Sequence, residues 1–166
     1  QENNVNNTNI MINSQEDIPD KSSAFGIFKQ ESKIGKELEQ LIQKQTSELK
    51  RKKEEGKVLL EECNELKEKI NDLRSKLENK KNYKFNLGDE MTNIIDEEEY
   101  NFYNKLKANK DEYKERLREF KEVKADINVL KGNIDMYKVS YLENFENWFY
   151  KKYGIRVEDY ELKVNK

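Results

Sequence analysis

Carboxylates are the most abundant side chains in this sequence that could do chemistry. They occur as neighbours at Glu54-Glu55, at Glu61-Glu62 and from Asp96 to Glu99. General acid–base catalysis needs a partly buried carboxylate in a cleft, where desolvation raises its pKa. A thin helical coil offers no such cleft, and consecutive carboxylates on a helix point in different directions. We therefore predict no catalytic residue, no metal ligand set and no enzyme activity for this segment.

Cofactor-binding motifs are missing, and so is a Cys/His nucleophile pair. Cys63 is the single cysteine and the sequence has no His, so neither a Cys/His pair nor a zinc tetrahedron can be built. Phosphate-binding glycine loops and kinase motifs are also missing. We expect no cofactor in these residues. We expect Cys63 to behave as a small buried apolar side chain at a seam of a coiled coil.

Residues 50–53, Lys-Arg-Lys-Lys, form the one concentrated basic run. Because leucines follow at intervals of seven residues, the run imitates the basic region of a leucine zipper. Glutamates flank it on both sides, so binding to DNA would release few counterions. We predict a solvated surface and no nucleic-acid binding. Contact with an acidic filament surface such as that of tubulin stays open as a functional alternative.

The composition indicates which elements hold these side chains. Charged residues make up 40% of the 166 residues and apolar residues 34%, with a mean hydropathy of −1.16. So little apolar surface suits thin seams between long helices better than a thick globular core. One Pro and six Gly leave room for few turns. No apolar run is long enough for a transmembrane helix and no signal peptide is present, so we expect no membrane contact.

The spacing of apolar residues predicts two long helices. Steps of four and three residues, the a/d alternation of a coiled coil, join Leu59, Cys63, Leu66, Ile70, Leu73 and Leu77. This alternation predicts a helix over residues 32–83, with a weak seam near Gly56 where we expect a bend or a local separation. A second stripe predicts a helix over residues 96–153 that ends at Gly154. We expect Asp96 and Glu99 to cap its start as a capping box.

The two predicted helices match in length, and residues 84–95 between them break the heptads. We therefore predict an all-α fold, an antiparallel coiled-coil hairpin with a connector. Residues 1–23 are rich in Asn and lack apolar periodicity, so we expect a disordered or extended lead-in. Residues 24–31 form an apolar anchor island, and residues 154–166 are expected to be a tail that forms a short strand or stays loose.

Aromatic side chains gather at the end of the predicted hairpin that lies away from the connector. Folding back would place the island at residues 24–31 beside the last turns of the second helix. We predict that one packing and docking surface is formed there by Phe25, Phe28, Tyr141, Phe145, Trp148 and Phe149. A fully buried Leu or Phe contributes about 1.5 to 3 kcal/mol. This makes the aromatic end the strongest docking surface that we predict.

Three stretches of the sequence carry a resemblance. They are the island Ala24-Phe25-Gly26-Ile27-Phe28-Lys29, the acidic helix start at residues 96–99 followed by Leu106, Lys107, Lys110 and Tyr113, and the closing set Leu142, Phe145, Glu146, Trp148 and Phe149. In order and approximate spacing, over about residues 24–150, these stretches resemble the C-terminal coiled-coil tail region of the kinesin-9 family of ciliary motors.

The resemblance implies a non-catalytic tail segment that anchors or dimerises a kinesin-9-like microtubule motor in the ciliary axoneme. It implies ATP and magnesium only for a motor domain upstream, and since the first residue is Gln we expect a longer polypeptide. The expected partners are other axonemal proteins, tubulin or microtubules, and a second copy of the chain in a homodimer. The expected location is the cytoplasm and cytoskeleton, in the axoneme of a cilium or flagellum. The alternative is a free-standing coiled-coil scaffold or microtubule-associated tether without a motor.

Overall fold

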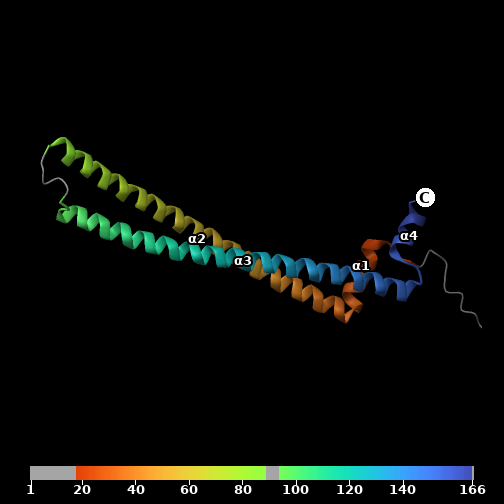
Figure 1. Ribbon diagram of the computed structural model, residues 1–166. Helices are drawn as coiled ribbons and strands as arrows, with labels where there is room; N and C mark the ends of the chain where they lie inside the picture. Colours follow the sequence, from red (N-terminus) through yellow and green to blue (C-terminus); the bar gives the residue numbers. More distant parts are fainter. Residues whose placement is uncertain (1–17, 89–93, 166) are drawn as a thin grey trace, which may run out of the picture. The chain divides into compact units, whose positions relative to one another are not determined.

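The computed structural model describes residues 18–88 and 94–165. Within those ranges the chain forms four α-helices and no β-strand (Figure 1). The helices are α1 (Lys21–Glu31), α2 (Lys33–Asn86), α3 (Glu97–Tyr153) and α4 (Val157–Val164). The prediction of an all-α fold with two long helices is confirmed.

The chain divides into two compact units. Gln1–Gln43 and Asp135–Lys166 form the first, which contains α1, the start of α2, the end of α3 and α4. We call it the aromatic unit. Lys44–Ile134 form the second, which contains the remaining turns of α2 and α3. We call it the coil unit.

In the coil unit, α2 and α3 run antiparallel. Glu62 of α2 pairs with Arg116 of α3. Further along α2, Lys80 pairs with Asp96, which immediately precedes α3. The partner on α3 thus moves toward the start of that helix as α2 advances, which is the predicted hairpin arrangement. The seam residues, each at most 8% exposed, are Leu59, Cys63, Leu66, Ile70, Leu73, Leu106 and Val123.

The prediction of a weak seam near Gly56 is wrong. Gly56 is buried, and a Cβ atom built on it would lie 3.4 Å from Cγ1 of Val123, an ordinary van der Waals distance. Because glycine has no side chain, α2 and α3 approach closely at the point where we expected them to separate. The neighbouring Lys52 pairs with Asp126 of α3 at 3.1 Å. This contact also ties the two helices together.

The connector predicted at residues 84–95 begins later than expected. α2 continues to Asn86, past the predicted end at residue 83. Gly88 follows with φ +64°, a left-handed conformation that glycine adopts without strain. Residues 89–93 lie outside the described residues.

The island at residues 24–31 belongs to a helix, α1, which begins at Lys21. Asp20 caps this helix, because its side chain accepts a hydrogen bond of 2.7 Å from the backbone N–H of Ser23. The hydrogen bond lowers the pKa of the Asp20 carboxyl. The lead-in predicted for residues 1–23 therefore ends earlier than expected, and its residues 1–17 lie outside the described residues.

Ser32 is the single residue between α1 and α2. Its backbone N–H donates to the carbonyl of Phe28 at 2.9 Å and ends α1. Its hydroxyl accepts a 3.1 Å hydrogen bond from the backbone N–H of Gly35 and so caps α2. Ser32 thus ends one helix and starts the next.

The tail predicted as a strand or loose segment at residues 154–166 instead contains a helix, α4, at Val157–Val164, and residue 166 lies outside the described residues. Gly154, with φ +71°, ends α3 at the predicted position and donates its N–H to the carbonyl of Tyr150 at 2.8 Å. α4 follows, and tertiary contacts hold it. The Tyr160 hydroxyl donates to the carbonyl of Ile18 at 3.2 Å, and Glu161 pairs with Lys21 at 2.8 Å.

Candidate functional site

The six aromatic side chains predicted to share a surface lie together in the aromatic unit. They are Phe25, Phe28, Tyr141, Phe145, Trp148 and Phe149. The ring of Phe25 stacks on that of Phe145 with centroids 3.9 Å apart. Phe28 meets Tyr141 edge-on at 5.2 Å and Trp148 at 5.4 Å. Phe149 lies 6.0 Å from Phe145. α1 and the end of α3 are thus joined by one aromatic cluster.

The exposed area of these rings determines whether they can contact a partner. Phe28, Phe145 and Phe149 are each at most 1% exposed. A side chain without exposed area cannot contact a partner while the unit stays folded. The prediction of a docking surface is therefore wrong for Phe28, Phe145 and Phe149, which form the core of the aromatic unit, while Phe25, Tyr141 and Trp148 are partly buried against that core.

Several residues of this core were missed by sequence reasoning. Ala24 and Val157 are buried in it, and Tyr153 and Tyr160 pack against it. Ala24 lies one helical turn before Phe28 on α1, so its spacing was an available signal. Val157 and Tyr160 share a face of α4 at a spacing of three residues, but a helix this short has too few repeats to show a period.

Tyr141 brings the one unsatisfied polar atom into this cluster. Its hydroxyl oxygen is buried and has no hydrogen-bond partner among the described residues. Burial raises the pKa of the Tyr141 phenol, because removing water disfavours the charged phenolate. The hydroxyl therefore stays protonated and offers no base or nucleophile at neutral pH.

The start of α3 carries the predicted cap. The Asp96 side chain accepts a 2.8 Å hydrogen bond from the backbone N–H of Glu99 and pairs with the Lys80 ammonium at 2.7 Å. Hydrogen bonds from Lys80 and from the Glu99 backbone lower the pKa of Asp96 from 3.8 to about 2. The Glu99 carboxylate contacts the Lys84 ammonium. It thus takes part in an ion pair with α2, and the reciprocal half of the predicted capping box is wrong.

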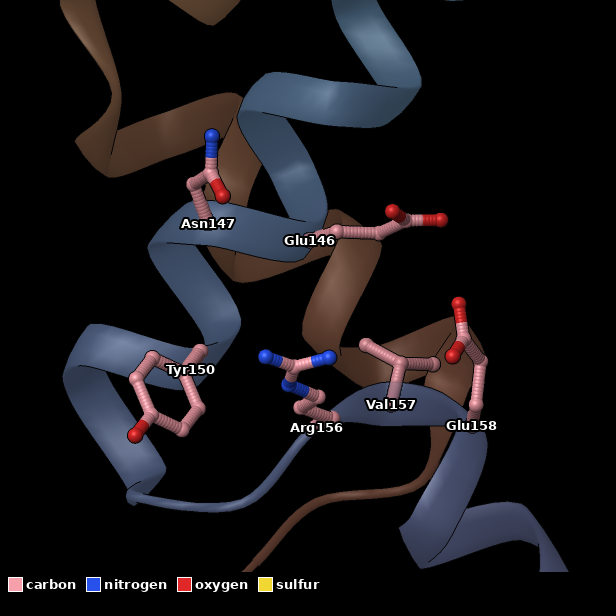
Figure 2. A pocket seen from close by; sticks show the side chains of 6 residues that line it. All are labelled: Glu146, Asn147, Tyr150, Arg156, Val157 and Glu158. Atoms are coloured by element: carbon pink, nitrogen blue, oxygen red, sulfur yellow. The ribbon is translucent and has the colours of Figure 1, made fainter.

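The aromatic unit contains a hollow of about 250 Å³, and Figure 2 shows the side chains that line it. Glu146, Asn147 and Tyr150 from α3 line one side, and Arg156, Val157 and Glu158 at the start of α4 line the other. The side chains of Glu146 and Glu158 come from these two opposite sides, and both carboxylates lie toward the right in Figure 2. No cysteine, serine or histidine that could act as a nucleophile or base lines it.

The remaining candidates are a metal site, a membrane-spanning helix and the basic run at residues 50–53. Across residues 18–88 and 94–165, no three His, Cys, Asp or Glu side chains converge as a metal site. None of the described helices combines the length and the apolarity needed to cross a membrane. Within the basic run, Arg51 pairs with Glu48 at 2.5 Å and Lys52 with Asp126 at 3.1 Å. Part of the run is therefore neutralised by the chain itself.

The sequence from just before α1 to the start of α4 matches a known family. Residues 19–158 match the Kinesin-like protein KIF9 domain. The chain belongs to this family. The predicted resemblance to the kinesin-9 family is confirmed, and membership indicates a kinesin-related protein associated with the cytoskeleton. No curated protein and no solved structure matches the chain.

Proposed function

We propose that this KIF9 domain is a non-catalytic tail segment that anchors a kinesin-9-like microtubule motor in the ciliary axoneme. The family match over residues 19–158 supports a kinesin-related role. The observation that carries the proposal is the closure of the coil unit on itself. Cys63 and Leu66 of α2 are each 5% exposed in a single chain, because α3 of the same chain covers them.

This closure favours anchoring over dimerisation through the seams. A parallel coiled-coil dimer would have to expose Cys63 and Leu66 before two chains could pair. Partners, including a second copy, therefore meet the outward faces of the helices. These faces offer large exposed apolar side chains, such as Val58 at 51% and Val129 at 62% exposure. Axonemal proteins, tubulin and microtubules are the partners that this proposal implies.

In this proposal, ATP binding and hydrolysis take place outside this segment. The sequence has no phosphate-binding glycine loop. The residues that the structure describes form no carboxylate cluster that could hold a metal ion. They do not fit ATP with magnesium, which we assign to a motor domain upstream. If the upstream reading frame encodes no such domain, the scaffold alternative replaces the motor tail.

Expression of the tagged chain in ciliated cells tests the anchoring role. We expect the signal to follow the axoneme and to remain there after detergent extraction. Leu66→Asp places a charge in the seam of the coil unit and should abolish retention. Gly26→Ala changes an exposed position with no neighbouring atom within 4 Å and should preserve it. Diffuse signal from the unmodified chain would contradict the proposal.

A further inference from the structure

Ten positions along one edge of the coil unit carry only basic or uncharged side chains, although Glu78 and Glu99 line the hollow beside Arg74 and Lys81 near the end of α2. These positions directly follow alternate seam residues, with seven-residue spacing on each helix. They are Lys53, Leu60, Lys67, Arg74 and Lys81 on α2, and Tyr103, Lys110, Leu117, Lys124 and Lys131 on α3. We call these ten positions the basic edge. None of them is acidic, although the whole sequence has 34 acidic against 32 basic residues.

Two hollows show that both helices contribute to this edge. The first, of about 330 Å³, is lined by Lys67 and Arg74 of α2 and by Lys110 of α3. The second, of about 290 Å³, is lined by Lys53 of α2 and by Lys124 of α3. No acidic residue lines either hollow. Apolar side chains that line them are Ile70, Tyr113, Leu60, Phe120 and Ile127.

Glu62, Glu119 and Asp126 directly precede seam positions, which places them on the opposite side of the seam, and each is paired. Arg116 reaches Glu62 at 3.0 Å and Glu119 at 3.3 Å, and Lys52 reaches Asp126 at 3.1 Å. On the basic edge, Lys53, Lys67, Arg74, Lys110 and Lys124 have no carboxylate within 4.0 Å among the described residues. The two edges of one hairpin therefore differ in charge and in pairing.

The basic edge brings like charges and exposed apolar surface together. Lys67 and Lys110 line one hollow, and Lys53 and Lys124 line the other. Like charges that line one hollow repel each other, more strongly at low ionic strength. Leu60, which lines the second hollow, is 46% exposed and loses part of the benefit of burial. A ligand that brings negative charge and apolar surface together would remove both penalties.

We propose that the basic edge binds an acidic amphipathic helix of a partner protein. Lys53, Lys67 and Arg74 repeat in steps of seven residues or twice seven, and each heptad of helix advances about 10.5 Å. A partner helix with Glu or Asp every seventh residue has the same repeat and would place carboxylates beside these cations. Its apolar side chains would fill the two hollows and complete a three-helix coil. The inference rests on the proposed anchoring role, since it names the chemistry of the anchor's receptor.

The apolar lining favours a helix over a nucleic acid. Phosphates would neutralise the lysines, but they would leave the exposed surface of Leu60 and of the partly buried Phe120 without an apolar partner. A purely acidic, unstructured peptide would leave the same surface uncovered. Amphipathic structure in the ligand is therefore part of the proposal, in addition to its negative charge.

Binding of a labelled peptide to the full chain tests the inference in solution. The probe is a synthetic helix of about four heptads with Leu at the core positions and Glu beside them. Fluorescence anisotropy should show binding that weakens as salt rises. A scrambled peptide of the same composition has the same charge without the apolar stripe, and we expect it to bind at least about tenfold more weakly.

Charge reversal on the chain gives the matched variants. Lys67→Glu with Lys110→Glu places two acids in the first hollow and should weaken binding by about tenfold or more. Lys69→Glu with Lys105→Glu makes the same change of net charge at exposed positions away from both hollows and should change binding by less than about twofold. A peptide with Lys in place of the facing Glu should restore binding to the first variant. Circular dichroism checks that each variant keeps its helices.

The outcomes separate this inference from the proposed function. Equal binding of the scrambled peptide, equal losses in the two double variants, or equally tight binding of a DNA duplex would each overturn the basic edge as a helix site. Absence of peptide binding to the unmodified chain would overturn it as well. Each of these results would leave axonemal retention of the tagged chain, and so the anchoring role, untouched.

Discussion

Replacing Gly35 by alanine should destabilise the aromatic unit, although alanine is the better helix former. A Cβ atom at Gly35 would lie 2.8 Å from Cε1 and 2.9 Å from Cζ of Phe28. Optimal carbon–carbon contacts are about 3.5 to 4.0 Å, so the ring has to move. Phe28 is fully buried and contacts Tyr141, Phe145 and Trp148. Any movement of the ring therefore displaces other rings.

The magnitude follows from two opposing effects. Alanine gains at most about 1 kcal/mol of helix propensity over glycine, and less in the first turn of α2, where Gly35 lies. Overpacking of a core costs about 1 to 3 kcal/mol. Since the contact with Phe28 is with a buried ring and not with a flexible chain end, we expect overpacking to dominate. The net loss should be about 1 to 2 kcal/mol.

Gly26→Ala is the matched control in the same unit. Gly26 lies inside α1, and a Cβ atom there meets nothing within 4 Å, so the propensity gain of about 0.5 to 1 kcal/mol should appear undiminished. Urea unfolding followed by the fluorescence of Trp148 measures both variants, because this single Trp lies 5.4 Å from Phe28. If Gly35→Ala proves as stable as Gly26→Ala, the argument from packing is refuted.

Three further predictions use buried or paired groups. Tyr141→Phe removes a buried hydroxyl without a partner, so we expect unchanged or higher stability, by up to about 1 kcal/mol in urea; a clear loss would show that the hydroxyl is satisfied. Burial raises the pKa of the Cys63 thiol, so iodoacetamide should label it slowly until urea unfolds the coil unit, and rapid labelling without urea would contradict the closed seam. The pKa of Asp96 is lowered from 3.8 to about 2, so its stabilisation is complete above pH 3.8 and is lost as pH falls toward about 2. Thermal unfolding should therefore show a stability difference between the unmodified chain and Asp96→Asn that shrinks across this range, and a constant difference would refute the assignment.

The long helices could be predicted because their signals repeat. α2 presents the a/d alternation over several heptads, and α3 has an acidic start at residue 96 and Gly154 at its end. α1 and α4 span 11 and 8 residues, too short for a period to stand out. Isolated helices of that length are marginal in water. Packing of Ala24, Phe28 and Val157 into one core stabilises them, and this depends on contacts distant in sequence.

The difference between repeated local signals and contacts distant in sequence also explains how much of the aromatic cluster could be predicted. Hairpin geometry alone was enough to bring Phe25 and Phe28 near Phe145 and Trp148. Whether those rings face solvent or a core depends on what covers them. Val157 of α4 is buried in the cluster and Tyr160 packs against it, and a chain end expected to be a strand or loose could not be predicted to supply this cover. Seam geometry at Gly56 was misjudged for a related reason, since a missing side chain can either weaken a seam or let the two helices approach.

The basic edge was hidden because its members are separated in sequence. Concentrated runs such as residues 50–53 attract attention, yet their charges are partly paired within the chain through Glu48 and Asp126. The cations of the basic edge lie seven residues apart on two helices, and only the antiparallel pairing places them along common hollows. A net charge of −2 is compatible with such an edge, because the acids of the seam lie on the other side. An acidic helix placed on that other side would meet Glu62 and Glu119, so the same asymmetry that attracts a partner also determines which edge it can occupy.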